Sequence, residues 1–319
     1  MIVDFHCHST ASDGTFAPAE LAAKGAGFVA LALTDHDNCD GVREFLEAGE
    51  ARDGRDARRP RLIAGIELSI EPGEGFDKFH LLGLGVDPND QGLKDFLRRV
   101  LEGRNGRNDR IIANFRRLGI EMENVRTIEQ SNNPNNRTIS QSNNPNNRTI
   151  EQSNIFSYAH GEVLARPHFA RWLMEHGHAA TIKEAFERYL LPDSPAATRC
   201  YEERWHPSQE DAFRVIHAAG GLCVMAHPKY WRADWKTTGC DFAAAERGLA
   251  ALKEKGLDGV EALYQANTGE ENVNFVRIAT KLGYLKSAGS DFHGANKPTI
   301  PLGMEVSENY IAPLLERLC

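Results

Sequence analysis

Short apolar runs alternate with amphipathic segments at both ends of this chain, and the alternation limits the folds that it can adopt. The runs are rich in valine, isoleucine, leucine and phenylalanine, as buried strands are, and they span residues 1–5, 28–33, 62–66, 79–86, 222–226, 259–263 and 284–288. Helical patterns lie between them at residues 18–25, 41–52, 209–219, 242–255 and 270–282. Such alternation is typical of a mostly parallel sheet covered by helices. We therefore expect an α/β fold in which about seven strands close into a barrel.

The middle of the chain, residues 90–195, has a different pattern. It offers no convincing strand and three helical segments, at residues 91–117, 162–176 and 182–190. We interpret it as a helical insertion that sits over the mouth of the barrel. The insertion would divide the barrel into a first part, residues 1–89, and a second part, residues 196–319.

A tandem repeat lies inside this insertion. The sequence RTIEQSNNPNN at residues 126–136 returns as RTISQSNNPNN at residues 137–147, and a third copy begins at Arg148. Each full copy carries NNPNN, which interrupts helices and strands alike, and the copies hold too little apolar surface to stack as a solenoid. We expect a polar loop over residues 126–154 that takes no part in the chemistry.

Composition excludes several classes of protein. The chain has 37 basic and 45 acidic residues and a formal net charge of −8, whereas binding to duplex nucleic acid needs a basic surface. No apolar run approaches the ~20 residues of a membrane span, and the sequence does not begin with a charged and apolar leader. The six cysteines are scattered without a CxxC pair, as is typical of reduced thiols in a cytoplasmic protein. We expect a cytoplasmic protein that binds neither membranes nor duplex DNA and has no obligate protein partner.

Two histidines stand two positions apart in the segment DFHCH near the N-terminus. On a strand, His6 and His8 would point to the same side, so both imidazoles could reach one point beyond the strand end. Asp13 follows five positions after His8 in a turn that contains Gly14, and it could bring a carboxylate to the same place. For the histidine pair alone, two structural histidines that are hydrogen-bonded to the backbone are an equally good interpretation.

Further ligand-type side chains stand at the ends of other predicted strands. The carboxyl ends of successive parallel strands converge on one face of a barrel, where active sites are built. With His6, His8 and Asp13, these side chains make a set of nine candidate ligands. One catalytic metal usually has three or four protein ligands, so the set indicates two or three ions. A set of histidines and carboxylates suits manganese, iron or zinc. The nine candidates are His6, His8, Asp13, His36, Glu67, His80, His227, Asp291 and His293.

The motifs HCH-x4-D, TDHD, GIE, the strand histidine, AHP and GSDFH, in this order, resemble the polymerase-and-histidinol-phosphatase (PHP) family of the amidohydrolase superfamily. The nearest branch resembles the TrpH-type metal-dependent phosphoesterases. The resemblance covers nearly the whole chain apart from the asparagine-rich repeat and the C-terminal end. It implies a distorted seven-stranded (β/α) barrel with a helical insertion, and a centre of two or three metal ions, most often manganese, with iron or zinc as alternatives.

The resemblance also implies how the ligands divide and what the site does. TrpH-type members include 3',5'-nucleotide bisphosphate phosphatases and 5'→3' exonucleases that trim short 5'-phosphorylated RNA. The expected activity is thus the metal-dependent hydrolysis of phosphate esters, with a small phosphorylated substrate, a nucleotide or a short oligoribonucleotide, as the partner. The implied ligand groups are His6, His8, Glu67 and Asp291 for one ion, Glu67, His80 and His227 for a second, and Asp13, His36 and His293 for a third.

Substrate contacts are expected at two further places. Arg166 and His168 stand at a predicted helix start, where backbone amides and the helix dipole favour anions, and the stretch RPHFAR resembles a phosphate-binding segment of TrpH-type enzymes. Lys229 and Tyr230 directly follow the ligand position His227. Together with Asp13 and His36, the groups expected to take part in catalysis are Asp37, Arg166 and His168. Asp37 would handle the proton of the leaving group, with a metal-bound water as the alternative. An arginine that merely solvates its helix is the alternative for Arg166.

Two other functions fit parts of this pattern. A histidinol-phosphate phosphatase would use the same metal site on a small amine-bearing phosphomonoester, but it would not need so many arginines in the insertion. A non-catalytic regulatory module with a metal site is the alternative from another class of protein. The complete ligand set argues against the module, because a decayed site should have lost some of its ligands.

Overall fold

The computed structural model describes residues 1–50, 60–71, 77–122, 155, 164–232 and 234–318. The chain divides into two compact units. The barrel unit comprises Met1–Leu101 and Trp205–Cys319, and the helical unit comprises Glu102–Arg204. The partition at residues 89/90 and 195/196 stays a prediction, and the repeat at residues 126–154 lies outside the described residues.

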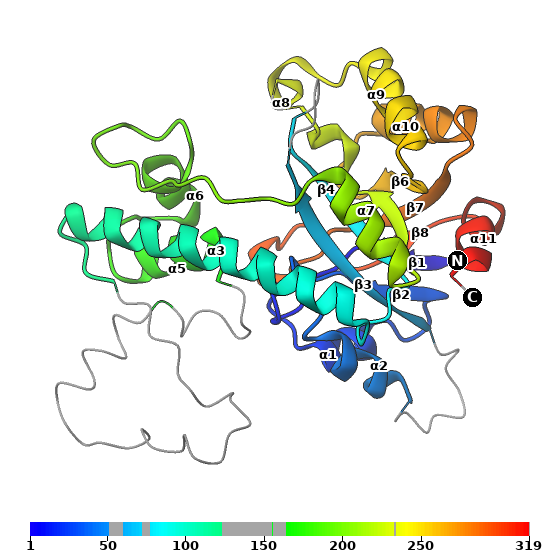
Figure 1. The fold of residues 1–319 in the computed structure, drawn as a ribbon, viewed down its shortest axis with the longest axis horizontal. Helices are drawn as coiled ribbons and strands as arrows, with labels where there is room; N and C mark the ends of the chain where they lie inside the picture. Colours follow the sequence, from blue (N-terminus) through cyan, green and yellow to red (C-terminus); the bar gives the residue numbers. More distant parts are fainter. Residues whose placement is uncertain (51–59, 72–76, 123–154, 156–163, 233, 319) are drawn as a thin grey trace. The chain divides into compact units, whose positions relative to one another are not determined.

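Strands and helices alternate along the barrel unit as the apolar pattern predicts (Figure 1). The strands are β1 Ile2–Asp4, β2 Ala30–Leu33, β3 Arg61–Ile70, β4 Phe79–Leu84, β5 Leu222–Met225, β6 Gly259–Tyr264, β7 Leu285–Gly289 and β8 Met304–Glu305. The helices are α1 Pro18–Lys24, α2 Val42–Glu50, α7 Gln209–Ala218, α8 Trp235–Thr238, α9 Phe242–Glu254, α10 Gly269–Lys281 and α11 Glu308–Arg317, with short 3-10 turns η5 Pro228–Tyr230 and η6 Gly294–Asn296. Helix α3, Gln91–Arg117, begins in this unit and has the predicted bounds.

The strands form one sheet in the order β7-β6-β5-β4-β3-β2-β1-β8. The chain that continues from β1 also bonds to the end of β7: the Phe5 amide donates to the Ala288 carbonyl at 2.9 Å, and the His8 amide donates to the Phe292 carbonyl at 2.9 Å. The sheet therefore closes almost into a barrel. The predicted α/β barrel of the PHP type is confirmed, with one strand more than the seven expected, because β8 pairs antiparallel with the outer side of β1.

Besides the short edge strand β8, one strand runs against the others. The pairs β1–β2, β2–β3, β5–β6 and β6–β7 are parallel, whereas β4 is antiparallel to both β3 and β5. Only residues 71–78 join β3 to β4, and a parallel crossover needs about a dozen residues or more. The reversal has a consequence for the site, since β4 begins at the face where the parallel strands end.

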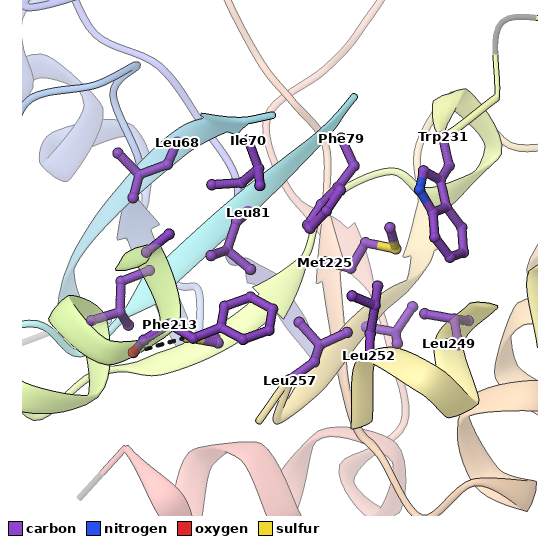
Figure 2. Packing of buried hydrophobic residues seen from close by; sticks show 14 of the residues in the cluster. Leu68, Ile70, Phe79, Leu81, Phe213, Met225, Trp231, Leu249, Leu252 and Leu257 are labelled. Atoms are coloured by element: carbon purple, nitrogen blue, oxygen red, sulfur yellow. Dashed lines mark hydrogen bonds between the residues drawn. The ribbon is translucent and has the colours of Figure 1, made fainter. Parts of the chain in front are cut away.

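Apolar side chains on successive residues of the strands go to opposite sides of the sheet, as the pleat requires. On the outer side, Leu81 and Met225 pack with Phe213 of α7 and Leu252 of α9 (Figure 2). Their sequence neighbours on the other side, Leu82 and Val224 among them, form a separate cluster with Val3, Phe5 and Ala30. The sheet is thus buried on both faces, which explains why its strands are near-continuous apolar runs.

The helical unit has its own core. Helix α5, Arg166–Glu175, starts four residues later than the predicted bound of 162, and residues 162 and 163 lie outside the described part of the chain. The segment predicted as one helix over 182–190 is α6, Ile182–Ala185, followed by a π-helical turn, Phe186–Leu190. The second half of α3 packs against α5 through Phe115 and Phe169. No strand occurs among the described residues of this unit.

Two further findings bear on the class of protein. No helix among the described residues is both long and apolar enough to span a membrane. The five cysteines that the structure describes are free thiols, and burial raises the pKa of Cys223 above its ordinary range.

Candidate metal centre

The nine candidate ligands gather at one face of the barrel, where the parallel strands end. His6 and His8 follow β1, His36 follows β2, and His227 follows β5. His80 is the second residue of β4, and it joins the others because β4 runs in the opposite direction. The barrel topology therefore brings together residues that the sequence separates widely.

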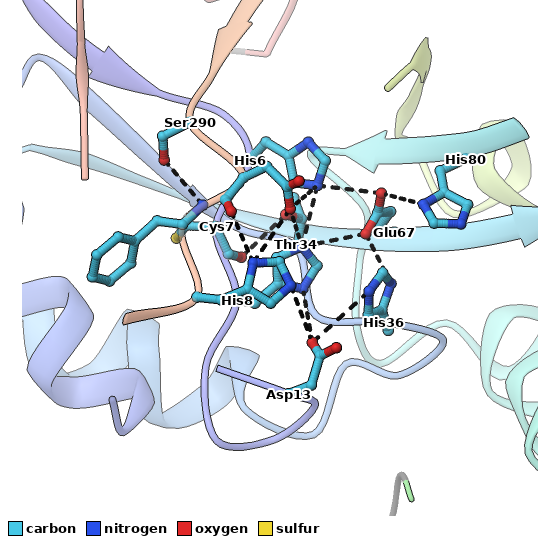
Figure 3. A network of polar contacts seen from close by, with 12 residues as sticks. His6, Cys7, His8, Asp13, Thr34, His36, Glu67, His80 and Ser290 are labelled. Carbon is cyan, nitrogen blue, oxygen red and sulfur yellow. Dashed lines mark hydrogen bonds and ion pairs between the residues drawn. The ribbon is translucent and has the colours of Figure 1, made fainter. Parts of the chain in front are cut away.

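The carboxylate of Glu67 lies at the centre of this group (Figure 3). Glu67 belongs to β3, is 1% exposed, and pairs across the sheet with His36 in an isolated parallel bridge. Both carboxylate oxygens are in close contact with histidine nitrogens. The distances are 2.8 Å to His36 and His80, 3.2 Å to His8 and His227, and 3.3 Å to His6.

Asp13 forms a second point of convergence. Its Oδ1 atom lies 3.3 Å from Nε2 of His293, 3.8 Å from Nε2 of His36 and 3.9 Å from Nδ1 of His8. The turn that carries Asp13 is held against the end of β2, because Ser9 and Ser12 both donate side-chain hydrogen bonds to Asp35 at 2.6 and 2.5 Å.

Asp291 connects these two points. Its Oδ1 atom lies 3.4 Å from His8 Nε2, 3.4 Å from His293 Nδ1 and 3.6 Å from His6 Nε2. Its Oδ2 atom accepts hydrogen bonds from the hydroxyl of Tyr264 at 2.9 Å and from the ammonium of Lys297 at 2.6 Å. One side of this carboxylate thus faces the histidines, while the other is fixed by the protein.

The donor atoms suit bound metal ions. The ligand atoms form three groups, and within each group the atoms lie within 4.8 Å of one another. The groups overlap, because His8, His36 and Glu67 each belong to two of them. Asp13 Oδ1, His36 Nδ1 and Glu67 Oε2 are buried, and their contacts with neighbouring ligand atoms do not have the geometry of hydrogen bonds, although buried polar atoms nearly always have a hydrogen-bond partner. Divalent cations would satisfy these atoms. The overlapping groups are His8, Asp13, His36 and His293; His6, His8 and Glu67; and His36, Glu67 and His80.

Electrostatics tie the imidazoles and carboxylates together. Burial alone would raise the pKa of Glu67, but the nearby imidazoles, His36 above all, hold it well below its ordinary value. Burial would likewise lower the pKa of His6, and the carboxylates of Glu67, Glu261 and Asp291 instead raise it well above its ordinary value. For His8, burial would also lower the pKa, but hydrogen bonds to Asp291 and Glu67 outweigh it and raise the pKa to about 9. Protons therefore compete with metal ions for these two histidines.

The backbone at the site is strained at three residues. Asp37, His227 and Asp291 have φ values of 57°, 25° and 59°, a region that residues other than glycine rarely adopt. Two of the three are candidate ligands, and Asp37 directly follows a third one, His36. Such strain is characteristic of functional sites, where the surrounding structure over-determines the conformation.

One buried carboxylate near the ligands was not among the sequence candidates. Glu261 of β6 is fully buried. Its Oε1 lies 3.0 Å from Nδ1 of His6, and its Oε2 accepts a hydrogen bond from the His227 amide at 2.6 Å. A carboxylate behind a metal-binding imidazole fixes the ring and its tautomer. The signal in the sequence was a glutamate in the middle of the apolar run GVEALY. Lys297 and Tyr264, which hold Asp291, carried no comparable signal.

We expect Glu261→Gln to weaken metal binding about 10- to 100-fold, as is usual when an outer carboxylate is lost, while the protein stays folded. Glutamine keeps an oxygen for the His227 amide but removes the negative charge beside His6. Metal titration against a competing chelator measures the change. Glu210→Gln, at an exposed glutamate of α7, is the control. Equal metal affinity in the two variants would mean that Glu261 only supports the fold.

Gly289 is the point where β7 passes directly behind this carboxylate. A Cβ atom at this position would lie 2.0 Å from Glu261 Oε1 and 2.5 Å from the Cβ atom of His6. We expect Gly289→Ala to lower the free energy of unfolding by about 1–3 kcal/mol and to reduce metal binding. Urea denaturation measures the first effect. Gly269→Ala at the start of α10, where no atom lies within 4 Å of the new Cβ, should not be destabilised, and equal losses in both variants would contradict this account.

The remaining candidates of the barrel unit have distinct surroundings. Asp37 is 1% exposed, and its Oδ1 accepts a hydrogen bond from the Ser69 amide at 3.3 Å. Tyr230 is 39% exposed, with its ring centroid 5.6 Å from that of His227. The ammonium of Lys229 is bound at 2.8 Å to Glu271 and at 2.8 Å to the Ala266 carbonyl, so a substrate would have to compete with these groups.

Arg166 and His168 lie in the helical unit at the start of α5. His168 is buried, and its Nδ1 accepts a hydrogen bond from the Ala165 amide at 3.0 Å. The half-buried guanidinium of Arg166 donates to the Leu190 carbonyl at 3.3 Å. Contact of these two side chains with substrate remains a prediction.

Comparison with known proteins identifies the family. A family model described as the PHP domain matches residues 4–190, which is more than half of the chain. The chain belongs to the PHP family. The resemblance found in the sequence motifs is thereby confirmed.

Relatives of this PHP protein span nearly its whole length. A 3',5'-nucleoside bisphosphate phosphatase from Chromobacterium violaceum is 30% identical over 91% of this chain and 87% of its own length. The 5'-3' exoribonuclease Rnm from Salmonella typhimurium is 28% identical over 96% of this chain and 89% of its own. An amidohydrolase from Chromobacterium violaceum, solved with bound sulfate, has a TM-score of 0.72 and 26% identity, covering 99% of this chain and 96% of its own.

Proposed function

We propose that this PHP protein is a metal-dependent phosphoesterase that hydrolyses phosphate esters of nucleotides. The observation that carries the proposal is the buried Glu67 carboxylate within 3.3 Å of five imidazoles, beside two further carboxylates at the same barrel face. The substrate would be a 3',5'-nucleotide bisphosphate or a short 5'-phosphorylated RNA. Both choices are supported by what the named relatives act on.

The nine ligands would hold two or three divalent ions. Manganese is preferred, as the family resemblance implies, and iron or zinc are the alternatives, which the imidazoles among the donors suit. When bound, the ions would neutralise phosphate charge and lower the pKa of water, so that hydroxide would be available at neutral pH to attack phosphorus. The division of ligands among the ions is part of the proposal. His8, His36 and Glu67 each belong to two overlapping ligand groups, which supports closely spaced ions.

The other side chains of the site would orient the reaction. Asp37, fixed by the Ser69 amide, would handle the proton of the leaving alkoxide. Arg166 and His168 would bind substrate phosphate, and Tyr230 offers an exposed ring beside His227 on which a base could stack. We also propose that the protein acts in the cytoplasm, since its scattered cysteines suit a reducing compartment.

Two product assays with the metal-loaded protein test this function: release of inorganic phosphate from the phosphomonoesters, and release of 5'-mononucleotides from the RNA. The substrates are 3',5'-adenosine bisphosphate, a short 5'-phosphorylated RNA and histidinol phosphate, each assayed with the native protein and with Asp13→Asn. We expect turnover of the bisphosphate or the RNA that EDTA and Asp13→Asn both abolish. Asp211→Asn, at an exposed carboxylate of α7, should remain active. Activity that survived EDTA would contradict the proposal, and turnover of histidinol phosphate alone would replace the substrate class.

A further inference from the structure

Another group of ligand-type side chains lies at the opposite end of the barrel from the candidate metal centre. It comprises His217 near the end of α7, Cys223 of β5 and Asp258, which immediately precedes β6. The metal centre lies where the parallel strands end, whereas Cys223 and Asp258 stand where β5 and β6 begin. Four positions of extended chain separate Cys223 from the candidate ligand His227, which corresponds to roughly 13 Å. One ion could not bind to both groups.

The barrel holds Cys223 and Asp258 side by side. Strands β5 and β6 are parallel, with Val224 opposite Gly259, so the residues that precede this pair are neighbours too. The Cys223 amide donates to Oδ2 of Asp258 at 2.8 Å, and the Asp258 amide donates to the Cys223 carbonyl at 2.9 Å. These two reciprocal hydrogen bonds fix the carboxylate beside the residue that carries the thiol.

The imidazole of His217 completes the group from α7, which packs beside β5 (Figure 1). Its Nε2 atom lies 2.7 Å from Oδ2 of Asp258. The imidazole nitrogen, a carboxylate oxygen and the sulfur of Cys223 all lie within 4.8 Å of one another. The thiol is fully buried, whereas the side chains of His217 and Asp258 are 39% and 24% exposed. An ion could therefore enter from solvent and reach the sulfur from that side.

The thiol of Cys223 is poorly suited to covalent or redox chemistry of its own. Burial raises its pKa above the ordinary value, and the carboxylate of Asp258 raises the pKa further, whereas reactive cysteines have a lowered pKa and an accessible sulfur. The hydrogen bond from the thiol to the Phe213 carbonyl is long, at 3.9 Å. A divalent ion would reverse this situation, because a thiol that coordinates a metal is deprotonated.

We propose that His217, Cys223 and Asp258 bind one zinc ion. Zinc accepts thiolate, imidazole and carboxylate ligands in a tetrahedral arrangement, and one thiolate with one carboxylate would balance its two charges. Bonds of about 2.0–2.3 Å place tetrahedral ligand atoms about 3.3–3.6 Å apart, so the partly exposed imidazole of His217 would move away from Asp258 by less than about 1 Å. The thiol proton would pass to solvent, the imidazole would carry its proton on Nδ1, and water would fill the fourth position.

The ion would join the end of α7 to the beginnings of β5 and β6. Strand β5 leads to His227, and β6 carries Glu261 behind the candidate metal centre. Because zinc would bind the folded chain with these three ligands in place, it would stabilise this half of the barrel. The site goes beyond the function proposed above and does not depend on it.

Cobalt titration of the full-length, EDTA-treated protein tests the site. Cobalt(II) occupies zinc sites, and a thiolate bound to it gives a charge-transfer band in the near ultraviolet. None of the nine candidate ligands of the metal centre is a cysteine, so the band would report the proposed site. We expect the band in the native protein, its disappearance when zinc is added, and its loss in Cys223→Ser. Cys240→Ser, at a half-buried free thiol of the barrel unit, is the matched control and should keep the band.

Variants of the other two ligands test the rest of the site, and they decide the matter if Cys223→Ser does not fold. His217→Ala removes a partly exposed side chain, and Asp258→Asn keeps an oxygen for the Cys223 amide. Each should weaken cobalt binding in the band titration at least about tenfold, the smallest loss usual even for an outer-shell partner. The rise in Tm that zinc causes should also be smaller in His217→Ala than in the native protein, since the metal centre is intact in both.

Three results would overturn the proposal. The first is absence of the band from native protein saturated with cobalt, and the second is its persistence in Cys223→Ser. The third is native cobalt affinity in either His217→Ala or Asp258→Asn, because the thiolate would then bind the ion without that ligand. Failure of the proposed hydrolysis would contradict only the proposed function, because the cobalt band does not depend on turnover.

Discussion

Replacing Glu67 with glutamine is expected to lower kcat more than about a hundredfold, beyond the 10- to 100-fold loss typical of an outer-shell partner. Among the carboxylates of the described site, Glu67 alone contacts five imidazoles. Glutamine has nearly the same shape, but it carries no charge, and its amide nitrogen would point a donor at histidines that must present lone pairs to a metal ion. Both metal content and turnover should therefore fall.

Metal analysis of the purified protein and initial-rate kinetics measure these two effects. Glu71→Gln is the matched control, because Glu71 follows the same strand and is exposed. Native metal content and native turnover in Glu67→Gln would mean that the carboxylate is not a ligand. A protein with normal metal content but no turnover would assign Glu67 to the chemical step instead of to metal binding.

The metal-free and metal-loaded forms are expected to respond to pH in opposite directions. The pKa of His8 is raised to about 9 in the folded, metal-free protein, against about 6.5 in an unfolded chain. The stabilisation by the protonated ring is fully present below pH 6.5 and is lost as the pH rises through 9. For His8 alone the free energy of unfolding should fall by about 3 kcal/mol across this window. His6, whose pKa is also raised, acts in the same direction.

Metal ions require the deprotonated imidazoles, so metal binding releases these protons and becomes tighter as the pH rises. The difference in Tm between metal-loaded and EDTA-treated protein should therefore widen from pH 6.5 to 8.5. Thermal unfolding at three pH values measures it, and His8→Asn should flatten the response of the metal-free form. A constant difference in Tm would show that His8 does not exchange a proton for the metal.

The strands and the ligands were predictable for the same reason, which is that both are visible in the local sequence. A strand such as β5, buried on both faces, is a short apolar run that local sequence reveals, and a polar residue such as His227 just beyond it stands out. The direction of β4 follows from the short connection between β3 and β4 and not from the apolar pattern within the strand itself. The strand β8, Met304–Glu305, is too short to show a period, and Pro313 inside α11 conceals that helix, since proline normally interrupts one.

Contacts between distant residues could not be predicted from local pattern. Glu261 lies in a predicted strand, but its partner His6 is 255 positions away, and only the closure of the barrel brings the two together. Lys297 reaches Asp291 through the turn that follows β7, and this turn has no apolar period. The arginines of α3 are similar, because the sequence shows their charge and not which of them are buried.

The left-handed backbone at Asp37, His227 and Asp291 has a consequence for protein engineering. Glycine would relieve a cost of order 1 kcal/mol or more at each position, so variants selected only for resistance to heat should accumulate glycine there. Two of these replacements would delete a candidate ligand. A heat-resistant library from this protein would thus become enriched in inactive members, unless activity were selected at every round.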